Sequence, residues 1–65
     1  MIEDAIIDIL ENHPGEHTIE TLAQYISMEI DEIPETVEAT IREMIESGRL
    51  EVKRDADGTM VPVVA

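Results

Sequence analysis

The sequence predicts a mainly helical α+β fold in which three helices precede a C-terminal β-hairpin. Three observations predict this fold. Apolar residues recur at helical spacing in three segments, and chain-breaking residues separate these segments. The last part of the chain alternates apolar and polar residues around a turn sequence. A chain of 65 residues has room for one small core, so we expect a single domain over residues 1–65.

The first helix is expected over residues 2–12, because five apolar residues share one helical face there: Ile2, Ala5, Ile6, Ile9 and Leu10. Pro14 and Gly15 end this helix, since proline cannot continue a helix and glycine permits a turn. Residues 17–19 are β-inclined and are expected to form a short strand. The second helix is expected to follow over residues 20–28.

The third helix is expected over residues 34–47. Pro34 suits the first helical position, where a missing N–H is harmless, and Asp31 is a candidate N-cap before it. Gly48 stands where a glycine commonly ends a helix.

A β-hairpin is expected over about residues 50–63. Residues 50–52 alternate as a strand, and Asp55 to Gly58 have turn chemistry. A second strand follows from Thr59 to Val63. Pro62 places that strand at an edge of the sheet, because proline lacks the N–H that a central strand needs.

The order of these elements resembles the winged helix-turn-helix family, and three stretches carry the resemblance: HTIETLAQYI, IPETVEATIREMIESGRLEV and KRDADGTMVPVV. In that family an alanine stands within the second helix, a proline opens the third, and a Gly-x-Leu sequence leads into the hairpin, called the wing. Ala23, Pro34, Gly48 and Leu50 match those places. The resemblance implies a three-helix winged helix-turn-helix fold. The family includes DNA-binding regulators and modules that bind only protein.

The charge of the chain is strongly negative and unevenly placed. The sequence has 16 acidic and 4 basic residues, a formal net charge of −12. Arg42 is the one base among residues 1–48, whereas acids and bases balance in residues 49–65. Such an acidic body repels duplex DNA at ordinary salt. Three interpretations remain open: the acidity keeps a small protein soluble, adapts it to high salt, or forms a surface for a basic partner.

The third helix has the wrong charge for the major groove, which the resemblance implies it would enter in a DNA-binding member. Its exposed face is expected to carry one arginine among four glutamates, and we treat these residues as a candidate protein-binding face: Glu35, Glu38, Arg42, Glu43 and Glu46. Phosphates would repel them. Direct DNA binding through this helix is therefore disfavoured, although not excluded.

The wing contains three of the four basic residues, Arg49, Lys53 and Arg54. They could contact phosphate or an acidic partner. The interpretation we favour is that they pair with Asp55, Asp57 and nearby glutamates of the helices, since exposed ion pairs of this kind are common and weak.

Three apolar residues lie off the expected core stripes, namely Ile7, Tyr25 and Met28. If they are contiguous and exposed, they would form an apolar patch for a protein partner. Alternatively they are loosely packed, or covered by residues 63–65.

Several function classes are disfavoured. The chain has no cysteine, which excludes disulfides and thiolate metal sites. His13 and His17 do not share a helix face, because Pro14 and Gly15 lie between them, so a metal site is not expected. Nothing indicates catalysis or a cofactor. No apolar run is long enough for a membrane, and the N-terminus lacks a basic signal-peptide region, so a soluble, cytoplasmic protein is expected.

The function that these observations favour is that of a small acidic protein-binding module. Its basic partner would belong to nucleic-acid machinery, such as a polymerase or a DNA-binding protein. The chain would act as an inhibitor or modulator, partly as a nucleic-acid mimic of the kind that viruses encode. The alternative is a transcriptional regulator that contacts DNA through its wing. The partner, the source and the oligomeric state stay open.

Overall fold

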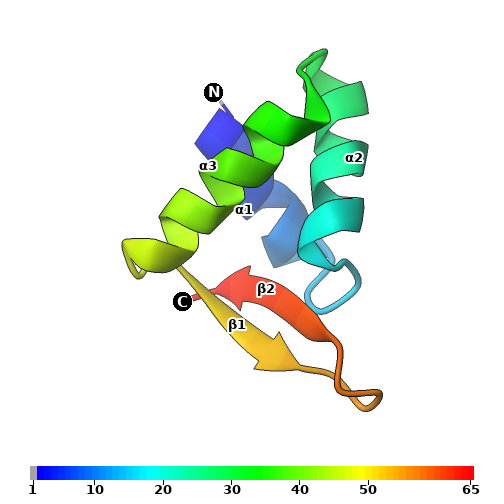
Figure 1. Ribbon diagram of the computed structural model, residues 1–65, viewed down its shortest axis with the longest axis vertical. Helices are drawn as coiled ribbons and strands as arrows, with labels where there is room; N and C mark the ends of the chain where they lie inside the picture. The colour runs from blue at the N-terminus through cyan, green and yellow to red at the C-terminus, as the bar shows by residue number, and fades with distance from the viewer. Residues whose placement is uncertain (1) are drawn as a thin grey trace.

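The computed structural model describes residues 2–65 (Figure 1). Three helices, α1 (Ile2–Asn12), α2 (Ile19–Ile30) and α3 (Pro34–Glu46), precede the antiparallel strands β1 (Leu50–Arg54) and β2 (Met60–Val64). The hairpin lies at one end of the helical unit, and the C-terminus lies close to the start of β1 (Figure 1). The fold is α+β and mainly helical, as expected, and the layout is compatible with a winged helix.

The core is one cluster to which all three helices and β1 contribute. Its buried members are Ile6, Leu10, Leu22, Ala23, Ile26, Val37, Ile41, Met44 and Leu50. The most extensive contact between helices is that of α2 with α3. Ala23 is almost fully buried, and a side chain this small lets two helices approach closely.

The short strand expected over residues 17–19 is absent, because residues 16–18 have no regular structure and α2 begins at Ile19. Thr18 and Thr21 explain the difference, since they form a reciprocal capping box. The Thr18 hydroxyl accepts from the Thr21 N–H at 3.1 Å, and the Thr21 hydroxyl accepts from the Thr18 N–H at 2.9 Å. The Thr18 carbonyl accepts from the Leu22 N–H at 2.9 Å. The backbone of Thr18 is therefore bound by α2 and is not free to pair with a strand.

Asp31 closes α2 and does not cap α3, contrary to the expectation from the sequence. It adopts a left-handed conformation (φ 56°, ψ 50°), and its N–H donates to the Ser27 carbonyl. Aspartate tolerates this conformation better than most residues. Ile33 occupies the N-cap of α3 without any side-chain cap, and Pro34 takes the first helical turn as expected.

Gly48 ends α3 as the sequence predicts. Its φ is +85°, and its N–H donates to the Ile45 carbonyl while the Arg49 N–H donates to the Met44 carbonyl. This pair of bonds is the Schellman arrangement, which needs a left-handed residue after the helix. The chain can then turn directly from α3 into β1.

Gly48→Val is expected to destabilise the fold by about 1–2 kcal/mol, because a β-branched residue is strained in the left-handed region. A Cβ at Gly48 would meet no atom within 4 Å, so backbone strain and not a steric clash would cause the loss. Urea denaturation followed by circular dichroism measures it. Gly48→Asn is the control and should lose less, since asparagine visits this region more readily. Equal stability of wild type and Gly48→Val would contradict this account of the turn.

The hairpin pairs Leu50 with Val64 and Arg54 with Met60, so its second strand runs one residue later than expected. Asp55 organises the turn, since its Oδ1 accepts from the N–H groups of Asp57 and Thr59, each at 2.9 Å. Pro62 lies opposite Val52 and is buried. As the sheet has two strands, Pro62 lies in an edge strand, as expected.

Candidate protein-binding surface

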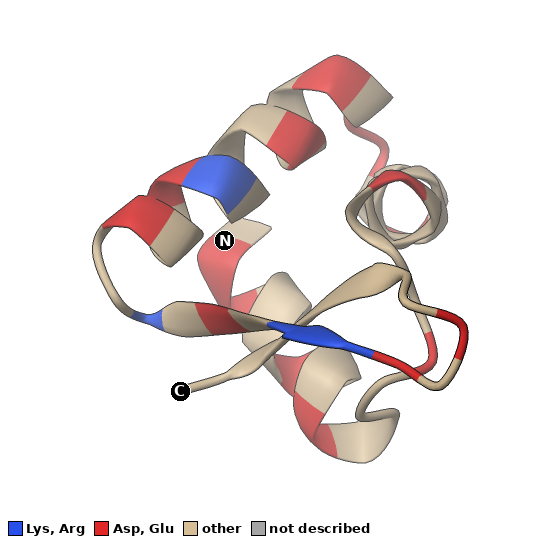
Figure 2. Ribbon diagram, turned by 60° about the horizontal axis from the view of Figure 1, so that its bottom comes forward, with Lys and Arg blue, Asp and Glu red and all other residues tan. Residues whose placement is uncertain are grey.

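The outer face of α3 is acidic, as Figure 2 shows by the red bands on this helix around a single blue one. Glu35, Glu43 and Glu46 are exposed, and Glu38 is half-buried. These side chains lie on the outside because the opposite face of the helix is occupied by buried Val37, Ile41 and Met44. The helical period alone therefore places the acidic residues on the solvent-facing side of α3. We call Glu35, Glu38, Arg42, Glu43 and Glu46 the acidic face of α3.

Arg42, the one cation of the acidic face, is already paired within the helix. Its Nε and Nη2 donate to Glu38 Oε2 at 3.2 and 3.1 Å, across one helical turn. The side chains are 59% and 35% exposed, so this is a surface ion pair of modest strength. Glu35, Glu43 and Glu46 have no cationic partner among residues 2–65. Three carboxylates therefore face solvent without a compensating charge.

The acidic face continues onto α2 through a shallow depression where the two helices cross. Its lining includes Glu20 of α2 together with Glu35 and Glu38 of α3, around the small side chains of Ala23 and Pro34. Glu20 and Glu35, 15 positions apart in the sequence, thus lie beside the same depression, which a basic side chain could enter.

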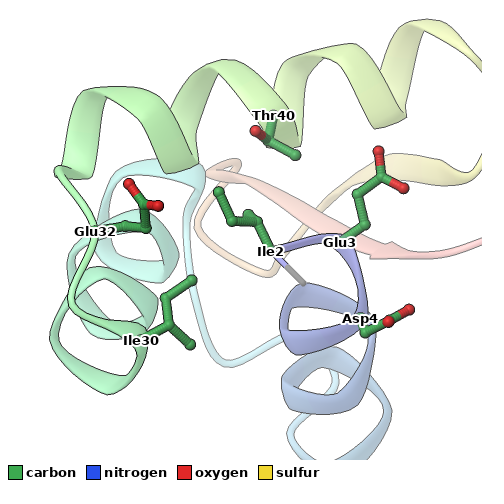
Figure 3. A pocket seen from close by; sticks show the side chains of 6 residues that line it. All are labelled: Ile2, Glu3, Asp4, Ile30, Glu32 and Thr40. Atoms are coloured by element: carbon green, nitrogen blue, oxygen red, sulfur yellow. The ribbon is translucent and has the colours of Figure 1, made fainter.

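A second negative region surrounds an open groove between α1, the end of α2 and the middle of α3 (Figure 3). Ile2 and Ile30, both half-buried, provide its apolar part, and Glu3, Asp4 and Glu32 provide carboxylates. Sequence reasoning did not select these residues as a site. No spacing signal could have done so, because α1 and the end of α2 meet only through tertiary packing.

The wing bases have different surroundings. Arg49 pairs with Glu3 of α1, as expected for a base near helix glutamates. Lys53 and Arg54 are exposed and form no ion pair within the described residues, so the expected pairing with Asp55 and Asp57 is wrong for them. For Asp55 the reason is that its Oδ1 accepts from the backbone of its own turn.

The three apolar candidates are not equally exposed. Met28 is 81% and Tyr25 39% exposed, and both lie on α2. Ile7 is half-buried and packs against the core, which agrees with the alternative of loose packing and not with an exposed patch residue. An additional exposed apolar residue, Ile33, precedes α3 and is 61% exposed.

Tyr25 is held by two neighbours. Its ring stacks on that of His17, with centroids 5.7 Å apart and an interplanar angle of 24°. Glu29 lies one helical turn further along α2. Hydrogen bonding to the Glu29 carboxylate, and then its negative charge, raise the pKa of Tyr25 above the ordinary value of 10.0.

Glu29→Gln is expected to lower the pKa of Tyr25 toward its ordinary value, because the charge that opposes phenolate formation is removed. Tyr25 is the only tyrosine and the chain has no tryptophan, so its absorbance titration reports this pKa directly. A raised folded-state pKa stabilises the fold below pH 10, and this contribution is lost as the pH rises through the folded value. Glu20→Gln removes the same charge elsewhere on α2 and should shift the titration less; equal shifts would contradict the assignment.

Residues 2–65 contain no group of three or more histidine, cysteine or acidic residues arranged to hold a metal ion. None of the helices described here has the length and the apolar character needed to cross a membrane. No family model matches the chain, and no similar curated protein or solved structure was found.

Proposed function

We propose that this chain is a protein-binding module of the winged-helix type that modulates or inhibits nucleic-acid machinery. Its acidic helical surface would dock on the basic surface of a polymerase or a DNA-binding protein. The observation that carries the proposal is the charge of α3. The helix that a DNA-binding winged helix would place in the major groove exposes Glu35, Glu43 and Glu46 without cationic partners.

Charge and geometry both oppose direct reading of DNA by α3. A protein gains affinity for DNA by neutralising phosphates with lysine and arginine. Arg42 is the only basic residue of α3, and its guanidinium group already forms an ion pair with Glu38. Any approach of this helix to a duplex would bring carboxylates toward phosphates in a chain whose net charge is −12.

The same features suit a basic protein surface. Lysine and arginine side chains that bind phosphate also bind carboxylates, and the guanidinium group does so with two hydrogen bonds. The acidic face of α3 and the carboxylate of Glu20 offer such acceptors over two adjacent helices. A partner that used these bases for nucleic acid could not bind both ligands at once, so docking would inhibit by competition. The net charge would also accelerate encounter with a basic partner.

One observation favours a second candidate, a regulator that contacts DNA through its wing. Lys53 and Arg54 are exposed and form no ion pair with residues 2–65, so their charges are available to phosphate. Two cations provide little affinity on their own, because each phosphate contact contributes modestly and salt weakens it.

Duplex binding separates the two candidates. The anisotropy of a labelled duplex is measured with wild type and with the triple variant Arg49→Gln, Lys53→Gln, Arg54→Gln, from low to physiological salt. The protein-binding proposal expects no tight complex with either chain at physiological salt. Nanomolar binding by wild type that the triple variant loses would overturn it in favour of the wing-led regulator.

The inhibitory role is tested by competition. Immobilised wild type is used to capture basic proteins from a cell lysate, and each captured protein is purified and titrated with labelled duplex in the presence of the chain. The proposal expects the chain to displace the duplex from its partner. Ternary complexes that retain the duplex at saturating chain would contradict inhibition by mimicry.

A further inference from the structure

Among residues 2–65, strand β1 has one edge without a strand neighbour, since the sheet they form contains β1 and β2 alone. Figure 2 shows β1 passing in front of β2. Unpaired edges are a template for another strand, and proteins commonly block them with proline or charged residues. Pro62 blocks β2 in this way, because it lacks an N–H. Strand β1 contains no proline but carries Glu51, Lys53 and Arg54, so only a strand with matching charges can pair with it.

The hydrogen bonds of the hairpin show which amides of β1 face this edge. Asp55 donates to the Thr59 carbonyl, and Ala65 donates to the Arg49 carbonyl. Bonded and non-bonded pairs alternate along an antiparallel ladder. In this register the odd-numbered residues of β1 therefore bond to β2, while the amides of Leu50, Val52 and Arg54 point away from it. The position of Pro62 opposite Val52 agrees, since proline can occupy only a non-bonded pair.

We propose that the free edge of β1 pairs with β1 of a second copy of this chain. The two strands would run antiparallel about a two-fold axis at Val52, so that a four-stranded sheet crosses the dimer. Val52 of each copy would then exchange hydrogen bonds with Val52 of the other, and Arg54 would do so with Leu50. This register uses the outward-facing amides and no others, so the ladder to β2 stays intact.

Charge complementarity selects the second copy as the occupant. In this register Glu51 lies opposite Lys53 of the other copy, and Lys53 lies opposite its Glu51. Both side chains are exposed, and each faces a valine within its own hairpin, so neither charge is satisfied there. Oppositely charged pairs directly across two strands are stabilising, and like charges are destabilising.

The neighbouring registers that use the same amides are unfavourable. Shifting the strands by two residues in one direction places Glu51 opposite Glu51, and shifting in the other places Lys53 opposite Lys53. The centred register is the one that pairs all five residues of Leu50–Arg54 and opposes unlike charges. The sequence of β1 therefore specifies the register of the proposed dimer.

Two further features favour contact at this edge. On the face of the sheet that carries Val52, the groove beside β1 is lined by the apolar side chains of Ile19, Ile45 and Met60 together with Arg42 and Glu46, so two Val52 side chains would meet next to partly apolar surface. The wing also belongs to the part of the chain in which acids and bases balance. Two copies can approach there with less repulsion than through any helical face.

Charge reversal tests the register. Sedimentation equilibrium of wild type at millimolar concentration and moderate salt is expected to show a weak dimer, because a strand edge is a small interface and salt screens the repulsion between the bodies. Glu51→Lys would oppose two pairs of lysines, and Lys53→Glu two pairs of glutamates. Each single variant is expected to dissociate at least about tenfold more readily. The double variant Glu51→Lys, Lys53→Glu restores unlike pairs and should dimerise as wild type does.

An equal mixture of the two single variants is the most discriminating experiment. One chain then carries lysine at positions 51 and 53, and the other carries glutamate at both, so both cross-strand pairs join unlike charges. A heterodimer should therefore form although neither variant dimerises alone. Net charge alone predicts otherwise: Glu51→Lys makes the chain less acidic and would strengthen a dimer held elsewhere. A wild type that stays monomeric, or a dimer that Glu51→Lys strengthens, would overturn the proposal.

Amide exchange gives a second readout that does not depend on charge. The outward N–H groups of Val52 and Arg54 should exchange with solvent more slowly as the wild-type concentration rises, and should exchange quickly at every concentration in Lys53→Glu. Concentration-dependent protection confined to the helices would also overturn the proposal, because it would place the dimer contact elsewhere.

Discussion

Ile41→Ala is expected to destabilise the fold by about 2–5 kcal/mol, because it removes three carbon atoms from the centre of the core and leaves a cavity. Ile41 is fully buried, lies in the middle of α3 and belongs to the core cluster. A domain of 65 residues has little stability to lose, so much of the variant should be unfolded at 25 °C. Urea denaturation followed by circular dichroism measures the loss.

Ile33→Ala is the matched control, since it makes the same chemical change four residues before Val37, the first buried position of α3. Ile33 is 61% exposed and provides no side-chain cap, so the change is expected to stay within about 0.5 kcal/mol. If Ile41→Ala leaves a folded ensemble too small to fit, Ile41→Val, expected to lose about 0.5–1.5 kcal/mol, supplies the value. Equal effects of Ile41→Ala and Ile33→Ala would contradict the assignment of the core.

The triple variant Glu35→Gln, Glu43→Gln, Glu46→Gln is expected to weaken the complex with a basic partner and to flatten its salt dependence. Each exposed charge pair contributes on the order of 0.2–1 kcal/mol, so three together change the affinity measurably where one would not. The fold should survive, since glutamine keeps the shape and most of the helix propensity of glutamate. The measurement is the Kd of a captured partner at several salt concentrations, with circular dichroism to verify folding.

A second triple variant separates the acidic face of α3 from overall charge. Glu11→Gln, Glu16→Gln, Glu29→Gln makes the same change in net charge at three exposed positions outside α3. The proposal expects this control to bind the partner nearly as wild type does. Equal weakening by both variants would show that the partner senses net charge alone, which would count against docking through α3.

Local chemistry was sufficient to predict the helices and the hairpin. Pro34 and Gly48 mark the two ends of α3 because each constrains its own backbone, whatever the rest of the chain does. The wrong predictions about secondary structure and helix caps concern residues with two competing local roles. Thr18 is a good strand residue and a good helix cap, and Asp31 can cap the start of one helix or close the end of another. In both cases the residue caps an end of α2: Thr18 caps its start and Asp31 its end.

The acidic face of α3 was also predictable, because a helical period separates buried from exposed positions without knowledge of the partner helices. Which charges on the surface are already paired was only partly predictable. The pair between Glu38 and Arg42 follows from their spacing of four residues in a helix. The pair between Glu3 and Arg49 joins α1 to the residue before β1 over 46 positions of sequence, and no local pattern indicates it.

By itself, then, the sequence determined the three helices, the glycine that ends α3, the hairpin and the outward acidic face, since each depends on backbone preference or periodicity within a few residues. Tertiary structure alone decided the burial of Ile7, the groove lined by Ile2, Ile30 and Glu32, and the freedom of Lys53 and Arg54. It also left β1 with an open edge, because β2 is its one strand neighbour among residues 2–65. These features depend on which segments meet in space, and contacts between distant segments follow from the packing of the whole core.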